Sequence, residues 1–97
     1  MPTLIITDHA AKRIKERLGL PKSAITPHVH RAYNEGWRHS HAHGKAKRFI
    51  DKLFLSHGNA SDIRIYGRFV FLFNGQVLIT VVPLPRSMIN GFKKENQ

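Results

Sequence analysis

The chain contains no cysteine, only six acidic residues, and no apolar run long enough to cross a membrane. The lack of cysteine excludes disulfides and thiolate chemistry, and it fits a reducing compartment. A membrane span needs roughly 18 consecutive apolar residues, so we expect no membrane partner. The N-terminus also lacks the basic segment and apolar block of a secretory signal. We therefore expect a cytoplasmic protein.

The scarcity of acidic residues leaves a large excess of positive charge. Sixteen Lys and Arg against six Asp and Glu give a formal net charge of +10, with seven histidines counted as neutral. Such a density is typical of proteins that bind polyanions, and it favours nucleic acid as the partner. The basic residues are spread along the whole chain, which disfavours a membrane-surface helix. An excess of lysine that serves solubility alone is the remaining alternative.

The length and the hydrophobic pattern together predict one α+β domain. A chain of 97 residues can build a single modest core. We expect that core over residues 4 to 85, with a partly disordered polar tail over 86 to 97. About three N-terminal helices should pack on one face of a C-terminal antiparallel meander of three to four strands.

Helical periodicity appears in three segments, at residues 8–18, 27–35 and 44–57. Residues before the first of them form a short strand or an extended lead-in. Thr7 can cap this first helix with its hydroxyl, and Gly19 can end it. Pro27 removes one backbone donor, so the second helix begins either near Thr26 or already at Ser23. We prefer the later start.

Three β-rich runs follow, at residues 62–66, 69–73 and 76–82. Two-residue turns at Gly67-Arg68 and Asn74-Gly75 separate them, and the second is a strong hairpin signal. Because turn length fixes the register, Tyr66, Phe69 and Thr80 are expected to lie side by side in one row.

This register divides the sheet into two unlike faces. The face that we expect under the helices is aliphatic and consists of Ile63, Ile65, Val70, Leu72, Val77, Ile79 and Val81. The other face is mixed and consists of Arg64, Tyr66, Phe69, Phe71, Phe73, Leu78 and Thr80. Guanidinium, rings and hydroxyls are groups that a polynucleotide site uses. The alternative is an ordinary second face, covered by the N-terminal segment or by another subunit.

A basic row borders the apolar arc of the first helix. His9, Arg13 and Arg17 recur every four residues and lie where this helix should meet its neighbour. They are candidates for a cleft that binds phosphate. The alternative is a set of solvated edge residues whose stems cover apolar surface.

The segment from Trp37 to Arg48 carries alternating histidines, His39, His41 and His43. Such a run can bind a transition metal. No Cys, Asp or Glu lies within it, so we expect no metal site and favour a basic loop that contacts phosphate. Trp37 is either a core residue or a surface for base stacking, and the sequence leaves both open.

The chain resembles small bacterial and phage proteins of the barnase/RelE-like ribonuclease superfamily in the order ITDHAAKRIKERLGL, two further helices, then IRIYGRFVFLFNGQVLITVVPLP. The resemblance covers residues 4 to 85. Its motifs are the H-x-x-x-R-x-x-x-R start of the first helix and the strand L-I-T-V followed by P-L-P. The resemblance implies helices packed on an antiparallel sheet, and an RNA-cleaving site made by the first helix and the strands.

These features predict a toxin-like or phage-encoded endoribonuclease that cleaves RNA by attack of the 2′-hydroxyl, without a metal or cofactor. His9 would act as base or acid, with positive charge stabilising the phosphorane. The expected catalytic residues are His9, Arg13, Tyr66 and Thr80. The expected nucleic-acid-binding residues are Arg17, Arg38, Lys45, Lys47, Arg48 and Arg64.

The expected partners are RNA, such as tRNA or mRNA, and an acidic protein such as an antitoxin. Two alternatives share the same surface chemistry. One is a non-catalytic nucleic-acid-binding or anti-defence protein that uses the same cations. The other is an inhibitor that presents Phe69, Phe71 and Phe73 to a protein.

Overall fold

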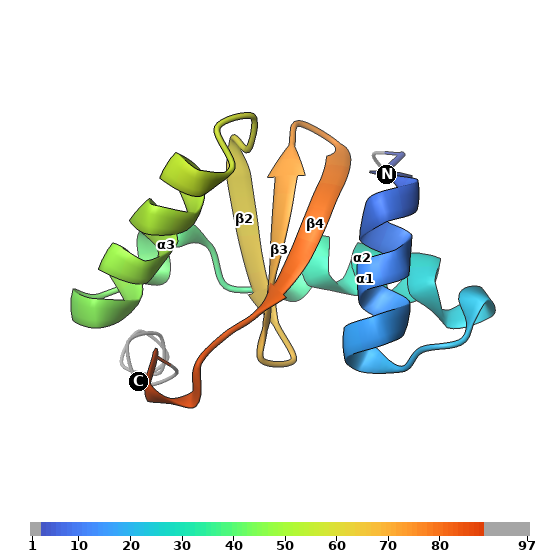
Figure 1. Ribbon diagram of the computed structural model, residues 1–97, viewed down its shortest axis with the longest axis horizontal. Coiled ribbons are helices and arrows are strands. Elements are labelled where there is room, and N and C mark those ends of the chain that lie inside the picture. The colour runs from blue at the N-terminus through green and yellow to red at the C-terminus, as the bar shows by residue number, and fades with distance from the viewer. Residues whose placement is uncertain (1–2, 89–97) are drawn as a thin grey trace.

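The computed structural model describes residues 3–88, which form a four-stranded sheet between helices (Figure 1). In chain order the elements are β1 (Ile5–Ile6), α1 (Asp8–Leu18), α2 (Lys22–Glu35), the short 3-10 helix η1 (His39–His41), α3 (Gly44–Ser56), β2 (Asp62–Tyr66), β3 (Phe69–Asn74), β4 (Val77–Pro83) and the 3-10 helix η2 (Arg86–Met88). The predicted α+β class, with helices before the sheet, is confirmed. Within the expected tail, 86–88 form η2, and the remainder lies outside the described residues.

Local side-chain chemistry sets the ends of α1 as predicted. The Thr7 hydroxyl accepts a hydrogen bond from the Ala10 amide at 3.1 Å and donates to the Leu78 carbonyl at 3.0 Å. Thr7 therefore caps the helix and also ties its start to β4. Gly19 ends α1 with a φ of +69°, and its amide donates to the Lys15 carbonyl. This backbone conformation costs glycine little.

The preferred start of the second helix was wrong, because α2 begins at Lys22 and carries Pro27 in its interior. Of the two predicted starts, the one at Ser23 is closer to the observed start at Lys22. Proline removes one amide donor from the helix, and that donor would have bonded only to the carbonyl of Ser23, which is exposed. The early turn buries Ile25 to 7% exposure against the sheet. Burial of this side chain offsets the missing hydrogen bond.

The sheet has the strand order β1-β4-β3-β2. Strands β2, β3 and β4 form the predicted antiparallel meander. The expectation of a wholly antiparallel sheet needs correction, because β1 pairs with β4 in parallel, with Ile5 opposite Val77. A strand that precedes the helices reaches the edge of the meander by running along β4.

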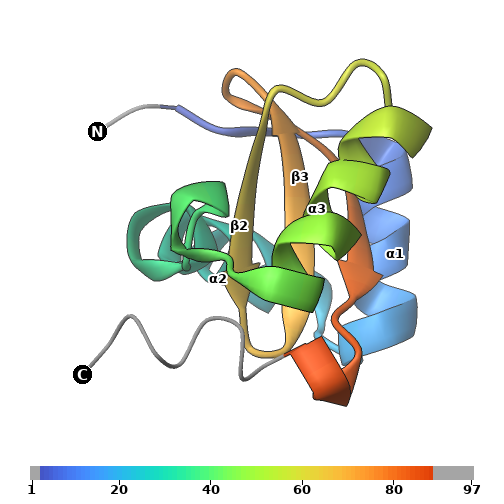
Figure 2. The ribbon, with the colours of Figure 1, turned by 90° about the vertical axis from the view of Figure 1, so that its left-hand side faces the viewer.

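The helices do not share one face of the sheet, which corrects the predicted layering. Helices α1 and α2 cover the mixed face, and α3 covers the aliphatic face, so the sheet is the middle of three layers (Figures 1 and 2). Phe71 and Phe73 are fully buried under α1 and α2, and Ile63 and Leu72 are fully buried under α3. Both faces of this sheet are apolar enough to need a cover. An open aromatic face is therefore excluded.

The β3–β4 register differs from the prediction, although the β2–β3 register, with Tyr66 opposite Phe69, is confirmed. The turn uses Gly75-Gln76, since Asn74 pairs with Val77. A bulge between Leu72 and Phe73 then shifts the pairing again, and Thr80 lies opposite Leu72. One inserted residue exchanges the faces of the strand beyond it. The predicted row of Tyr66, Phe69 and Thr80 is therefore wrong.

Candidate nucleic-acid interface

The start of α1 places His9 against β4. His9 lies in the first turn of α1 and is exposed, and its Nε2 atom is 3.2 Å from the Oγ1 atom of Thr80. Thr80 is 4% exposed. The pair joins residues 71 positions apart in the chain. Because a hydroxyl both donates and accepts, this contact can hold either neutral tautomer of the imidazole.

The two arginines of α1 follow His9 at intervals of one helical turn. Arg13 is half-exposed and forms an ion pair with Glu16, with 3.0 Å between Nη1 and Oε1. Arg17 is exposed near the end of the helix. The predicted row is therefore open to solvent, and one of its guanidiniums already has an anionic partner.

Arg64 does not belong to this site, because it is 3% exposed and lies on β2, which β3 separates from β4 in the sheet. Its Nη1 atom lies 2.6 Å from a carboxylate oxygen of Asp62, and its Nε donates to the Tyr33 carbonyl at 3.0 Å. The guanidinium also lies 4.7 Å from the centre of the Tyr33 ring. These partners satisfy the charge inside the protein. The expectation that Arg64 binds phosphate is not supported, since its charge is not accessible.

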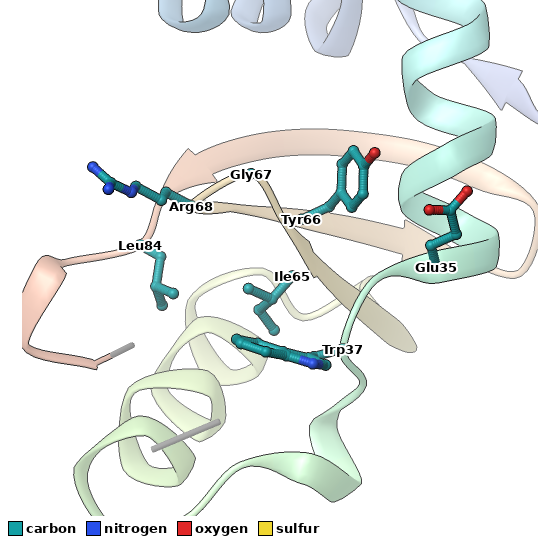
Figure 3. A pocket seen from close by; sticks show the side chains of 7 residues that line it. All are labelled: Glu35, Trp37, Ile65, Tyr66, Gly67, Arg68 and Leu84. Carbon is teal, nitrogen blue, oxygen red and sulfur yellow. The ribbon is translucent and has the colours of Figure 1, made fainter. Parts of the chain in front are cut away.

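Tyr66 lies at the far end of β2 and contacts α2. Its ring meets the His28 ring edge-on, with 5.3 Å between the ring centres. It also lines a pocket with Trp37 and Arg68 that does not include His9 (Figure 3). Of the expected catalytic set, the structure thus joins His9 to Thr80, and it places Tyr66 in a separate pocket.

The surroundings of His28 disfavour the charged form of its imidazole. Its Nε2 atom is buried and has no hydrogen-bond partner among the described residues. Burial lowers the pKa of the imidazole below its ordinary value, and the positive charge of Arg31 lowers the pKa further. The sheet offers it the rings of Tyr66 and Phe71, neither of which is an anion at neutral pH. Protonation of His28 therefore works against the fold.

We expect the free energy of unfolding to fall as the pH drops below about 6.5, the ordinary pKa of histidine. Between that value and the lowered pKa of folded His28, the unfolded chain binds a proton that the folded chain does not, so acid favours unfolding. His28→Phe keeps a ring against Tyr66 and should show a smaller loss over the same range. Urea unfolding of both proteins between pH 7 and 5 measures this. If the free energy of unfolding falls equally with pH in both proteins, the assignment of this pH dependence to His28 is contradicted.

The histidine-rich segment is a folded connection. His39 Nε2 lies 2.9 Å from a carboxylate oxygen of Asp51 on α3, and Lys47 lies 3.4 Å from the other oxygen. Desolvation raises the pKa of Asp51, but the hydrogen bonds from His39 and Lys47 outweigh it, so the pKa falls below its ordinary value. His41 accepts a hydrogen bond from the Arg38 amide. Residues 3–88 contain no group of three potential metal ligands.

Helix α3 presents a row of cations to solvent. Lys45, Arg48 and Lys52 are exposed, and their spacing of three and four residues puts them on one face of the helix. They line a shallow hollow of about 240 Å³ with Phe49 and Met88. None of the three cations forms an ion pair within the described part of the chain. We call Lys45, Arg48 and Lys52 the α3 basic row.

The structure therefore separates the four expected binding residues between positions 38 and 48 into three kinds. Lys45 and Arg48 belong to the α3 basic row. The third member of this row, Lys52, was not among the predicted binding residues. Lys47 is paired with Asp51, and Arg38 stands exposed at the start of η1. The seven-residue spacing from Lys45 to Lys52 was a visible helical signal.

Glu35 and Arg68, which line the pocket of Tyr66, were not among the predicted site residues. No local pattern pointed to them. They line the same pocket only because α2 ends beside the β2–β3 turn (Figure 3). Trp37, for which two roles were open, is half-buried between this pocket and the core under α3.

Within the described residues, no helix combines the length and apolar character that crossing a bilayer requires. Comparison with protein-family models, with curated proteins and with solved structures found no match to this chain. The resemblance to the barnase/RelE-like superfamily therefore stays a prediction that depends on the quoted motifs alone.

Proposed function

We propose that this protein binds RNA and that the α3 basic row is its main contact with the phosphate backbone. The observation that carries this proposal is the presence of three exposed cations on one helix face, without anionic partners, in a chain of net charge +10. Phe49 shares their hollow and offers a ring beside the charges. Cations and an aromatic ring side by side suit single-stranded or looped RNA. A cytoplasmic location is part of the proposal.

The experiment is a titration of labelled single-stranded RNA at several KCl concentrations in EDTA. Each cation that neutralises a phosphate releases counterions, so log K should fall linearly with log salt concentration. Three such contacts predict a slope of about −2 or steeper on a single strand. Binding that is absent at 50 mM KCl, or that does not respond to salt, would overturn the proposal.

Metal-independent RNA cleavage is a second candidate function, and the contact between His9 and Thr80 favours it. An exposed imidazole held by a hydroxyl is suited to remove the 2′-hydroxyl proton. Arg13 and Arg17 would stabilise the charge that develops on the phosphorus oxygens. An acidic antitoxin would block this activity by covering the same cations.

For this candidate, we expect parent protein and EDTA to yield 2′,3′-cyclic phosphate ends, and we expect His9→Ala to lower the rate by about 10²-fold or more. Gel analysis of RNA fragments measures both. His57→Gln, which changes a histidine at the end of α3, is the matched control and should retain the rate. If the parent yields no cyclic phosphate, or if His9→Ala is fully active, cleavage at this site is excluded and RNA binding remains.

A further inference from the structure

A pocket of about 350 Å³ opens between the end of α2 and the β2–β3 turn (Figure 3). Its lining, which we call the Trp37 pocket, consists of Glu35, Trp37, Ile65, Tyr66, Gly67, Arg68 and Leu84. Its volume is near the lower end of the range for small-molecule sites, roughly 300–1,000 Å³. Two aromatic rings and two aliphatic side chains combine here with one carboxylate and one guanidinium.

The backbone holds Trp37 firmly in this pocket. Its amide donates to the Ile65 carbonyl at 2.9 Å, and its carbonyl accepts from the Ile65 amide at 2.8 Å. Gly36 permits this close approach, since a Cβ atom there would lie 3.0 Å from the Ile65 carbonyl oxygen and 2.5 Å from that of Ala32. The backbone that carries the indole is therefore fixed, and the indole lines the pocket. A rigid ring stacks on a ligand with little loss of entropy.

Arg68 occupies a backbone conformation that disfavours its own residue type. It has a φ of +70°, in a two-residue turn whose other member is Gly67. Glycine or asparagine is the usual choice at such a position, and an arginine there costs of order 1 kcal/mol. Within residues 3–88 the exposed guanidinium has no ion pair. The positive φ belongs to the two-residue turn that joins β2 to β3. This turn places the exposed side chain of Arg68 at the rim of the pocket.

The Glu35 carboxylate is the most unexpected member of the pocket. It is one of only six acidic residues, and it makes no hydrogen bond or ion pair with the described residues. This exposed carboxylate repels phosphate and can accept hydrogen bonds from a ligand that donates them. Figure 3 shows it at the opposite end of the pocket from Arg68. The pocket thus has an accepting end and a cationic end.

We infer that the Trp37 pocket binds one unpaired nucleobase of an RNA strand and that it prefers guanine. The base stacks on Trp37 beside Tyr66, Glu35 accepts hydrogen bonds from its edge, and Arg68 contacts the adjoining phosphate. Guanine offers two neighbouring N–H donors on its Watson–Crick edge, which match both carboxylate oxygens. The other bases place an acceptor beside each donor, and a carboxylate repels it. This inference rests on the proposed RNA binding.

Intrinsic fluorescence tests the pocket directly, because Trp37 is the single tryptophan of the chain. The probes are octauridylate and the same RNA with one central guanosine, in EDTA. We expect the guanosine RNA to bind about tenfold more tightly and to quench Trp37 more strongly. Glu35→Gln should abolish the preference. Glu16→Gln changes the net charge equally, away from the pocket, and should retain it.

The outcomes separate this inference from the proposed function. If neither RNA binds, the proposed function fails as well. If both bind equally and leave Trp37 emission unchanged, or if Glu35→Gln keeps the preference, the pocket assignment is wrong while RNA binding stands. Free guanosine monophosphate should quench Trp37 only weakly, because it lacks the contacts of a strand. If this mononucleotide bound as tightly as the RNA with one central guanosine, the assignment to RNA would be overturned.

Discussion

Changing the α3 basic row to glutamine is expected to weaken RNA binding about 10²-fold at 0.1 M salt. Each of Lys45, Arg48 and Lys52 that neutralises one phosphate contributes about 0.7 to the slope of log K against log salt on a single strand. The triple variant should therefore have a slope shallower by about 2. Since all three side chains are exposed and have no ion pair within the described residues, glutamine should leave the fold intact.

The matched control is the triple variant Lys12→Gln, Lys15→Gln and Lys22→Gln. These lysines are also exposed, and their loss lowers the net charge by the same amount, but they lie on α1 and at the start of α2. Fluorescence anisotropy with one labelled RNA at four salt concentrations compares the two triples. If both lose the same affinity, RNA binding depends on overall charge, and the α3 basic row is not the contact surface.

The chain's secondary structure could be predicted where the determining chemistry is local. The cap at Thr7, the stop at Gly19 and the strands of the meander depend on near neighbours in the sequence. The β3–β4 bulge could not be predicted, because no residue type marks it. The shift of the turn to Gly75-Gln76 moved Thr80 out of the row of Tyr66, and the bulge then placed it opposite Leu72. Half of the expected catalytic arrangement was lost in this way.

The layering could not be predicted for a different reason. Alternation assigns residues to two faces, but it does not say which helix covers which face when both are apolar. The sequence left open whether Phe71 and Phe73 are accessible or covered, because Arg64 and Thr80 were expected on the same face. In the structure they are fully buried under α1 and α2. A face with several phenylalanines is more economically explained as a second core than as an open binding surface.

Arg64→Ala should destabilise the protein by roughly 3 kcal/mol while leaving the RNA affinity of the folded molecule unchanged. The substitution removes the ion pair with Asp62 and leaves the Tyr33 carbonyl without its donor. Asp62 keeps 41% of its side chain exposed, so water can solvate it, and the loss should be near the lower end for a broken buried pair. For a domain of this size, the melting temperature should fall by roughly 12 °C or more.

This prediction discriminates between the two roles of an arginine that the sequence could not separate. If Arg64 bound phosphate, Arg64→Ala would weaken RNA binding and change stability little. Arg48→Gln provides the opposite case, since this exposed side chain should change stability by less than about 0.5 kcal/mol and still reduce RNA affinity. Urea unfolding gives the free energy of unfolding of each variant, and RNA titration gives its affinity. If Arg64 has a buried structural role, Arg64→Ala lowers only the stability and Arg48→Gln lowers only the RNA affinity. The reason is that a guanidinium bonded to Asp62 and Tyr33 cannot also reach a phosphate.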